Sequence, residues 1–187
     1  MIFLFTFFLF ILIFFIQKFC IYPLEKNIFP SALIEQASIL YLPHAARIIT
    51  FYVLGPIVLI PIFLSQCFTY IVLNDFNIIN SMILSFLSTL SIFLGFELFR
   101  LFKKNILFEI DKIVDWKKMI LIGFLTSIFN SNLSSAYLSF NNKSTFDILL
   151  NFRFLLGDVL GLVFGMLIFT YLIKAYSIWI YNVRYKN

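Results

Sequence analysis

The sequence predicts an all-α fold, a polytopic bundle of about six transmembrane helices, on three observations. Hydrophobic residues make up 62% of the chain and charged residues only 12%. Apolar runs long enough to cross a hydrocarbon core of ~30 Å as helices recur along the sequence. Six such spans would use most of the 187 residues, which leaves no stretch for a separate soluble domain. We therefore expect one membrane domain over residues 1–187, with the lipid bilayer as a partner.

The first span is predicted at residues 2–17. No basic residue precedes this run and no small-x-small cleavage site follows it, so we expect an uncleaved helix rather than a signal peptide. Residues 18–36 contain Pro23 and Pro30 among four charged side chains. That composition is typical of a loop.

The second span, residues 38–54, is unusual because it contains Pro43, His44 and Arg47. Proline removes a backbone donor and clashes with the preceding turn, so we predict that this span is broken near Pro43. The sequence leaves open whether the span crosses the membrane fully or re-enters. Pro56 suits the first turn of a third span at residues 56–73.

The remaining spans are predicted at residues 78–101, 119–139 and 154–173. Between the fourth and the fifth, residues 102–118 place apolar side chains at helical spacing and charged side chains on the other faces. Such a segment can lie on the membrane surface. We expect an amphipathic connector on the cytoplasmic side, with a partner-docking helix as the alternative.

Basic residues orient the predicted bundle. With both termini in the cytoplasm, nine lysines and arginines fall on the inner side and four on the outer side, as the positive-inside rule requires. We therefore predict a multi-pass protein of the bacterial inner membrane with both termini cytoplasmic. The net charge of +5 then reflects topology and contact with anionic lipid, not nucleic-acid binding. The inner residues are Arg100, Lys103, Lys104, Lys112, Lys117, Lys118, Lys174, Arg184 and Lys186, and the outer ones are Lys18, Lys26, Lys143 and Arg153.

Arg47 lies near the middle of the second span. An arginine at that depth costs roughly 2.5–3.5 kcal/mol on insertion scales, so we expect it to face the protein interior and to have a partner. Asp158, at a similar depth in the sixth span, is the predicted partner. Arg47 can then be structural, locking two helices together, or it can bind an anion or act in gating. The sequence leaves these alternatives open, and the same two classes of role apply to Asp158.

Three glycines, Gly157, Gly161 and Gly165, share one face of the predicted sixth helix with Asp158. Glycines spaced in this way let a neighbouring backbone approach closely. We predict that this face is a helix-packing surface within the chain. Homodimerisation through the same face is the alternative, so the oligomeric state stays open.

The fifth span carries six polar residues in its middle and outer half. They can line a ligand cavity or bond between helices, and we favour the cavity because six groups exceed what one helix contact uses. Asn130 in this span and His44 in the second are candidate ligand-binding residues. A single histidine and two distant cysteines do not make a metal site, and no nucleophile and base pair is visible, so we expect no metal, no cofactor and no enzyme activity. The six residues are Ser127, Asn130, Ser131, Asn132, Ser134 and Ser135.

Two segments resemble hallmarks of a known family. Residues 42–47, Leu-Pro-His-Ala-Ala-Arg, followed by Gly55, are similar to the Trp-Pro-Pro-x-Gly segment of the first type of bacterial membrane-associated sensor domain. Residues 154–161, Phe-Leu-Leu-Gly-Asp-Val-Leu-Gly, resemble that family's Trp-Leu-Gly-Asp-x-Leu-Gly, although the family's tryptophans are missing. That domain forms the input half of histidine kinases and diguanylate cyclases. The resemblance covers residues 40–172 and implies a shortened, stand-alone sensor domain that acts through a separate partner.

Three functions therefore compete. The first is a sensor-like protein that binds a small ligand within the bundle and signals through a kinase, a cyclase or another membrane subunit. The second is a small transporter or substrate-capture subunit, for which a broken span is equally apt. The third is a structural subunit of a membrane complex, docked through the glycine face.

Overall fold

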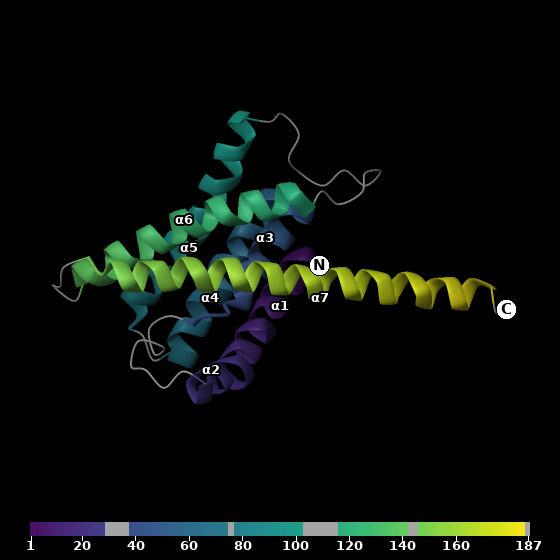
Figure 1. Ribbon diagram of the computed structural model, residues 1–187, viewed down its shortest axis with the longest axis horizontal. Helices are drawn as coiled ribbons and strands as arrows, with labels where there is room; N and C mark the ends of the chain where they lie inside the picture. Colours follow the sequence, from purple (N-terminus) through teal and green to yellow (C-terminus); the bar gives the residue numbers. More distant parts are fainter. Residues whose placement is uncertain (29–37, 75–76, 103–115, 142–145, 186–187) are drawn as a thin grey trace.

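The computed structural model describes residues 1–28, 38–74, 77–102, 116–141 and 146–185, which are almost entirely helical and contain no strand (Figure 1). The predicted all-α class is therefore confirmed. The elements are α1 (Ile2–Ile16), the π-helical turn η1 (Gln17–Ile21), α2 (Tyr22–Ile28), α3 (Leu42–Leu54), the 3-10 turn η3 (Gly55–Val58), α4 (Leu59–Asn74), α5 (Ile78–Phe102), α6 (Trp116–Asn141) and α7 (Ile148–Tyr185).

Within the described residues, five helical segments are long and apolar enough to cross a membrane. They contain 25 to 32 residues each, and their most apolar stretches have mean hydropathies of 1.3 to 2.4. This pattern indicates an integral membrane protein. The predicted second and third spans fall together in one of the five segments, Leu42–Leu73. Six separate crossings therefore stay a prediction.

The first helix is longer than the sequence predicted. We expected a loop over residues 18–36, but the chain stays helical through η1 and α2 to Ile28, so the loop prediction was wrong for residues 18–28. The π-helical turn lies directly before Pro23, and the Tyr22 amide donates to the Gln17 carbonyl five residues earlier. A widened turn of this kind lets a helix continue past a residue that lacks a backbone donor.

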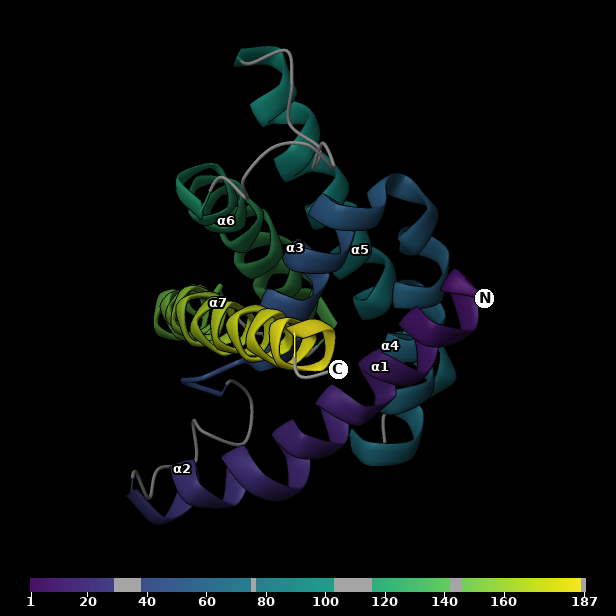
Figure 2. The ribbon, with the colours of Figure 1, turned by 90° about the vertical axis from the view of Figure 1, so that its right-hand side faces the viewer.

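Helix α3 lies in the centre of the bundle (Figure 2), where it contacts α1, α5, α6 and α7. Eight of its 13 residues are buried. It begins at Leu42 and Pro43 occupies its first turn, so the expected break inside the helix is not observed there. At about 1.5 Å per residue, α3 alone is about 20 Å long, which is shorter than the hydrocarbon core.

The chain changes direction after α3. Gly55 ends the helix with a φ of 74°, a left-handed conformation that favours glycine. The turn η3 follows with Pro56 in its first positions, and α4 then runs back along α1 and α5 (Figure 2). Residues 42–73 therefore form two helices joined by a sharp turn.

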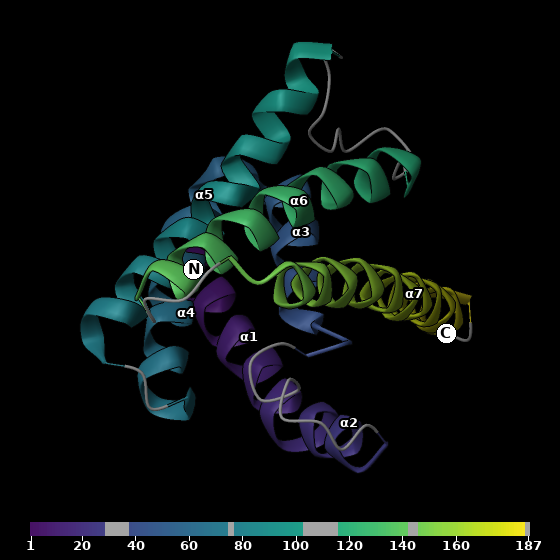
Figure 3. The ribbon, with the colours of Figure 1, turned by 60° about the vertical axis from the view of Figure 1, so that its left-hand side comes forward.

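The glycine face of α7 packs on residues 38–45, which lie beside α7 in Figure 3. A Cβ atom added at Gly157 would meet the Ser38 carbonyl, and one at Gly161 would meet the Tyr41 carbonyl. At Gly165 it would meet the Ala45 side chain. The Tyr41 amide also donates to the Gly157 carbonyl over 3.0 Å. The face is therefore covered within the chain, and it holds a non-helical segment, residues 38–41, against α7.

Buried apolar side chains gather toward one end of the bundle. They come from the C-terminal half of α5 and from the first two turns of α6, where Ile92, Phe96, Met119 and Ile122 are 3% exposed or less. The other halves of these two helices carry buried polar residues instead. This division places the polar site at the end of the bundle where α6 terminates.

The predicted connector, residues 102–118, falls almost entirely outside the described residues. At its edge, Arg100 and Glu97 form a local ion pair, with 3.0 Å between Nη2 and Oε2. Both side chains are exposed, which is typical of a pair that contributes little to stability.

Candidate functional site

A polar cavity of about 450 Å³ lies between α1, η1, α3, α4, α5, α6 and α7. Its lining follows α6 from Asn141, the last residue of that helix, to Asn130, which is about 16 Å deeper at about 1.5 Å per residue. The volume is in the range of small-molecule sites, about 300–1,000 Å³. Residues that line it include Gln17, Lys18, Tyr22, Ser38, Tyr41, Arg47, Thr69, Tyr70, Asn80, Ser88, Asn130, Ser134, Asn141 and Asp158.

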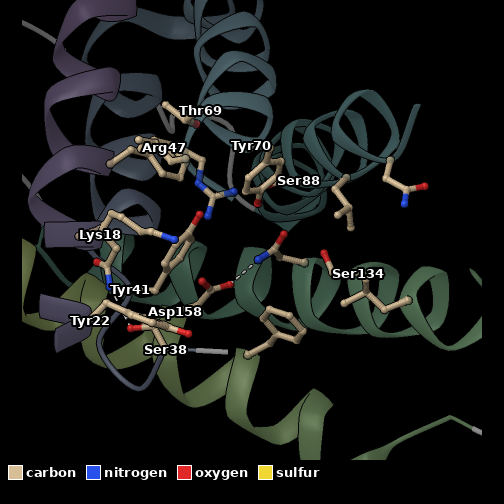
Figure 4. Close-up of a pocket in the computed structure, with 18 of the residues that line it drawn as sticks. Lys18, Tyr22, Ser38, Tyr41, Arg47, Thr69, Tyr70, Ser88, Ser134 and Asp158 are labelled. Atoms are coloured by element: carbon tan, nitrogen blue, oxygen red, sulfur yellow. Dashed lines mark hydrogen bonds between the residues drawn. The ribbon is translucent and has the colours of Figure 1, made fainter. Parts of the chain in front are cut away.

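Asp158 lies at the inner end of the cavity and is 1% exposed. The Asn130 side-chain amide donates to its Oδ2 atom over 2.6 Å (Figure 4). The Nδ1 atom of His44 lies 3.4 Å from the same oxygen. Three of the four predicted site residues therefore form one buried cluster from α3, α6 and α7.

His44 is 1% exposed and is not among the residues that line the cavity. On its far side, Nε2 lies 3.1 Å from the Ser127 hydroxyl and 3.3 Å from the Gly123 carbonyl. The Ser127 hydroxyl itself donates to the Gly123 carbonyl over 2.8 Å, and the Nδ1 atom of His44 has no hydrogen-bond partner among the described residues. His44 therefore packs against Asp158 on the side away from the cavity and does not line the cavity itself.

Arg47 lines the cavity from α3 and is 1% exposed. Its Nε atom donates to the Pro43 carbonyl over 3.3 Å, and its guanidinium carbon lies 5.4 Å from the centre of the Tyr41 ring. Neither Nη1 nor Nη2 has a hydrogen-bond partner among the described residues. Two of the three guanidinium nitrogens thus lie buried and unsatisfied beside the cavity.

The predicted Arg47–Asp158 ion pair is not formed. Both residues line the same cavity, but Asp158 takes its contacts from Asn130 and His44, and the terminal nitrogens of Arg47 have no partner. Figure 4 shows the two side chains on opposite sides of the cavity. Arg47 and Asp158 lie at similar depths and therefore line the same site, but the amide of Asn130 is the nearer partner of the Asp158 carboxylate.

The outer wall of the cavity depends on Gln17, at the end of the first predicted span, and on Glu25, in the predicted loop. Gln17, in η1, donates to the Leu40 carbonyl and accepts from the Leu42 amide, at 2.9 and 3.0 Å. Glu25, in α2, accepts from the Ile39 and Leu40 amides at 3.1 and 2.7 Å. These two side chains supply hydrogen bonds to backbone groups of the non-helical segment 38–41, which makes no intrahelical hydrogen bonds of its own.

Glu25 is the less expected of the two, because it is a carboxylate that is only 7% exposed. The Ser38 hydroxyl contacts both of its oxygens, at 2.8 and 2.9 Å. No sequence pattern indicated this contact, since Glu25 and Ser38 are 13 positions apart with Pro30 between them.

The polar residues of the fifth predicted span divide between the two expected roles. Asn130 and Ser134 line the cavity, whereas Ser127 contacts His44. Asn132 is exposed and accepts from Asn151 of α7 at 3.0 Å. Part of this polar surface therefore faces the cavity, and part serves contacts between helices.

Among the described residues there is no group of three or more metal-ligating side chains. Comparison of the chain with family models, with curated proteins and with solved structures gave no match.

Proposed function

We propose that the chain is a sensor-like protein of the bacterial inner membrane that binds a small molecule in the polar cavity and signals its occupancy through a partner protein. The observation that carries the proposal is the cavity itself, about 450 Å³, in which charged, amide and hydroxyl groups converge among apolar side chains such as Phe14, Leu84 and Phe154. Buried polar groups are costly in such a setting unless they are satisfied, so their convergence favours a binding role.

The direction of access follows from the predicted topology. With cytoplasmic termini, the ends of α4 and α6 and the start of α5 lie on the outer side, where Leu73, Asn80 and Asn141 line the cavity. A small molecule from outside the cell would then enter at this end. It would reach Arg47 and Asp158 at the inner end.

A route for signalling is also present. Asp158 belongs to α7, which continues as one helix of 38 residues to Tyr185. At about 1.5 Å per residue this helix is about 57 Å long, and its C-terminal part extends beyond the rest of the bundle in Figure 1. A displacement of α7 at the cavity could therefore be conveyed to the cytoplasmic side. The resemblance to sensor domains supports a kinase or cyclase as the partner.

A transport or substrate-capture role is the second candidate, and one observation favours it. Residues 38–41 are non-helical, partly buried, and packed against Gly157 and Gly161. Gly157 is about 14 Å along α7 at about 1.5 Å per residue. Interrupted backbone at such depth, beside a polar cavity, is common in transporters. The structural-subunit alternative has less support, since its glycine face is covered by the same chain.

Native mass spectrometry of the protein, purified in lipid nanodiscs, tests the proposal. Ser134 lines the cavity and is 8% exposed, so Ser134→Phe should fill the cavity, whereas Ala136→Phe on the exposed face of the same helix should not. We expect a small non-lipid adduct on the wild type and on Ala136→Phe that is lost in Ser134→Phe. A small non-lipid adduct retained equally in all three, or absent from all three, would reject binding of a soluble small molecule in the cavity. Uptake of that species by proteoliposomes would shift the function to transport.

A further inference from the structure

The strongest unexplained feature of the cavity is the guanidinium of Arg47. Its Nη1 and Nη2 atoms carry four N–H donors, and neither atom has a partner among the described residues, although the side chain is 1% exposed. A buried, unsatisfied charged group is expensive in any protein and more so in a membrane. In Figure 4 these nitrogens point into the space between Tyr70, Ser88 and Asp158.

The charges around the cavity favour an anion. The charged side chains that line it are Lys18, Arg47 and Asp158. Asp158 already receives a hydrogen bond from Asn130, so one of its carboxylate oxygens has a partner. Lys18 adds a second cation nearer the mouth of the cavity, and in Figure 4 its amine points toward Tyr41 and Arg47.

The shape of the free donors also matters. The two terminal nitrogens of a guanidinium form a planar fork that matches two oxygens of a carboxylate or phosphate group. Tyr41 lies against the guanidinium and limits its rotation, since its ring centre is 5.4 Å from the guanidinium carbon. The fork is therefore held in place before any ligand arrives.

We propose that Arg47 binds the anionic group of the ligand, a carboxylate or a phosphate, and that Lys18 assists at the mouth of the cavity. The proposal rests on the function proposed above and names the chemical class of its ligand. The anion could belong to a soluble molecule or to a phospholipid headgroup. The two sources share the same chemistry at Arg47.

Thermal unfolding of the purified protein tests the proposal with three probes at constant ionic strength. Two are soluble, inorganic phosphate and succinate, and are added to protein in phosphatidylcholine nanodiscs. The third is phosphatidylglycerol, mixed into the nanodisc lipid. Arg47→Met removes the fork, and Arg100→Met is the matched control, because Arg100 is exposed and paired with Glu97.

At least one probe should raise the melting temperature of the wild type and of Arg100→Met. For Arg47→Met the half-saturating concentration of a soluble probe should rise about 100-fold, since each lost hydrogen bond to a charged group weakens binding about tenfold or more. Stabilisation by phosphate or succinate identifies a soluble ligand, and stabilisation by phosphatidylglycerol alone identifies a lipid headgroup. Stabilisation that is equal in Arg47→Met, or absent with all three probes, overturns the proposal.

Arg47→Met should fold, because it removes a buried charge whose two terminal nitrogens lack partners. Without anions its melting temperature should equal or exceed that of the wild type. Lys18→Gln, at a half-buried position in η1, provides a second variant and should weaken soluble anions severalfold without loss of folding. If the adduct found by mass spectrometry is neutral or cationic and is lost in Ser134→Phe, the cavity still binds a ligand but the anion assignment is wrong.

Discussion

Replacement of Glu25 by glutamine should destabilise the protein far more than the same replacement at Glu97. The Glu25 carboxylate accepts from the Ile39 and Leu40 amides at 3.1 and 2.7 Å, and the Ser38 hydroxyl lies within 2.9 Å of both oxygens. A glutamine keeps one acceptor oxygen and turns an NH₂ group toward the other donor. One backbone amide then loses its acceptor inside the protein.

The magnitude follows from the kind of bond that is lost. Hydrogen bonds to a charged group contribute about 1.5–3 kcal/mol each, and an unsatisfied buried donor costs about 1–3 kcal/mol. Allowing for relief of the buried charge, we expect Glu25→Gln to lower the free energy of unfolding by about 2–4 kcal/mol. That corresponds to a fall in melting temperature of roughly 5–15 °C for a chain of this size.

Glu97→Gln is the matched control. Glu97 is a partly exposed carboxylate with a single ion pair to Arg100, three residues away on the same helix. Exposed pairs of this kind contribute up to about 1 kcal/mol. Circular dichroism during heating in detergent measures both variants. Equal shifts in the two variants would refute the role of Glu25 in holding residues 38–41.

Three further predictions concern packing, the Asp158 cluster and topology. Gly161→Leu should lower the melting temperature or abolish accumulation in membranes, because the leucine side chain would displace the Tyr41 backbone. Val163→Leu, on the exposed face of the same helix, should have little effect. A fully stable Gly161→Leu protein would show that the glycine face points to lipid. Double-mutant cycles followed by thermal unfolding test the Asp158 contacts. The effects of Asn130→Ala and Asp158→Asn on the free energy of unfolding should be coupled by about 1 kcal/mol or more, whereas those of Arg47→Met and Asp158→Asn should be nearly additive. The reverse pattern would support a direct ion pair between Arg47 and Asp158. In a chain without native cysteines, Asn77→Cys should react with an impermeant reagent outside intact cells and Lys117→Cys should not, and the opposite labelling would invert the topology.

The sequence was sufficient for the helical class because membrane-spanning helices need little beyond length and apolarity. It failed at residues 18–28 because Pro23 was weighed as a helix breaker, and no pattern announces a π-helical turn that accommodates a proline. The end of α3 at Leu54 matches the predicted boundary before Gly55 and Pro56. Its late start at Leu42, after the non-helical residues 38–41, depends on tertiary contacts that local sequence does not specify.

The candidate site was found in part by the cost of polar residues in lipid. That reasoning selected Arg47, Asn130 and Asp158, which the structure brings to one cavity. It could not assign partners, because depth along a helix leaves the rotation of each side chain undetermined. Gln17 and Glu25 were missed because their contacts are made with residues 38–42, at least 13 positions away in sequence.

Cysteine accessibility at two neighbouring serines tests most directly whether small molecules enter the bundle. Ser88 and Ser85 lie one helical turn apart on α5, both are buried, and neither hydroxyl has a partner in the described structure, but only Ser88 is among the residues lining the cavity. With Cys20 and Cys67 replaced by serine, Ser88→Cys should react with a small anionic methanethiosulfonate much faster than Ser85→Cys. Arg47→Met should slow that reaction. Equal and negligible reaction at both positions would contradict the account, because it would show that the cavity is closed to molecules of this size.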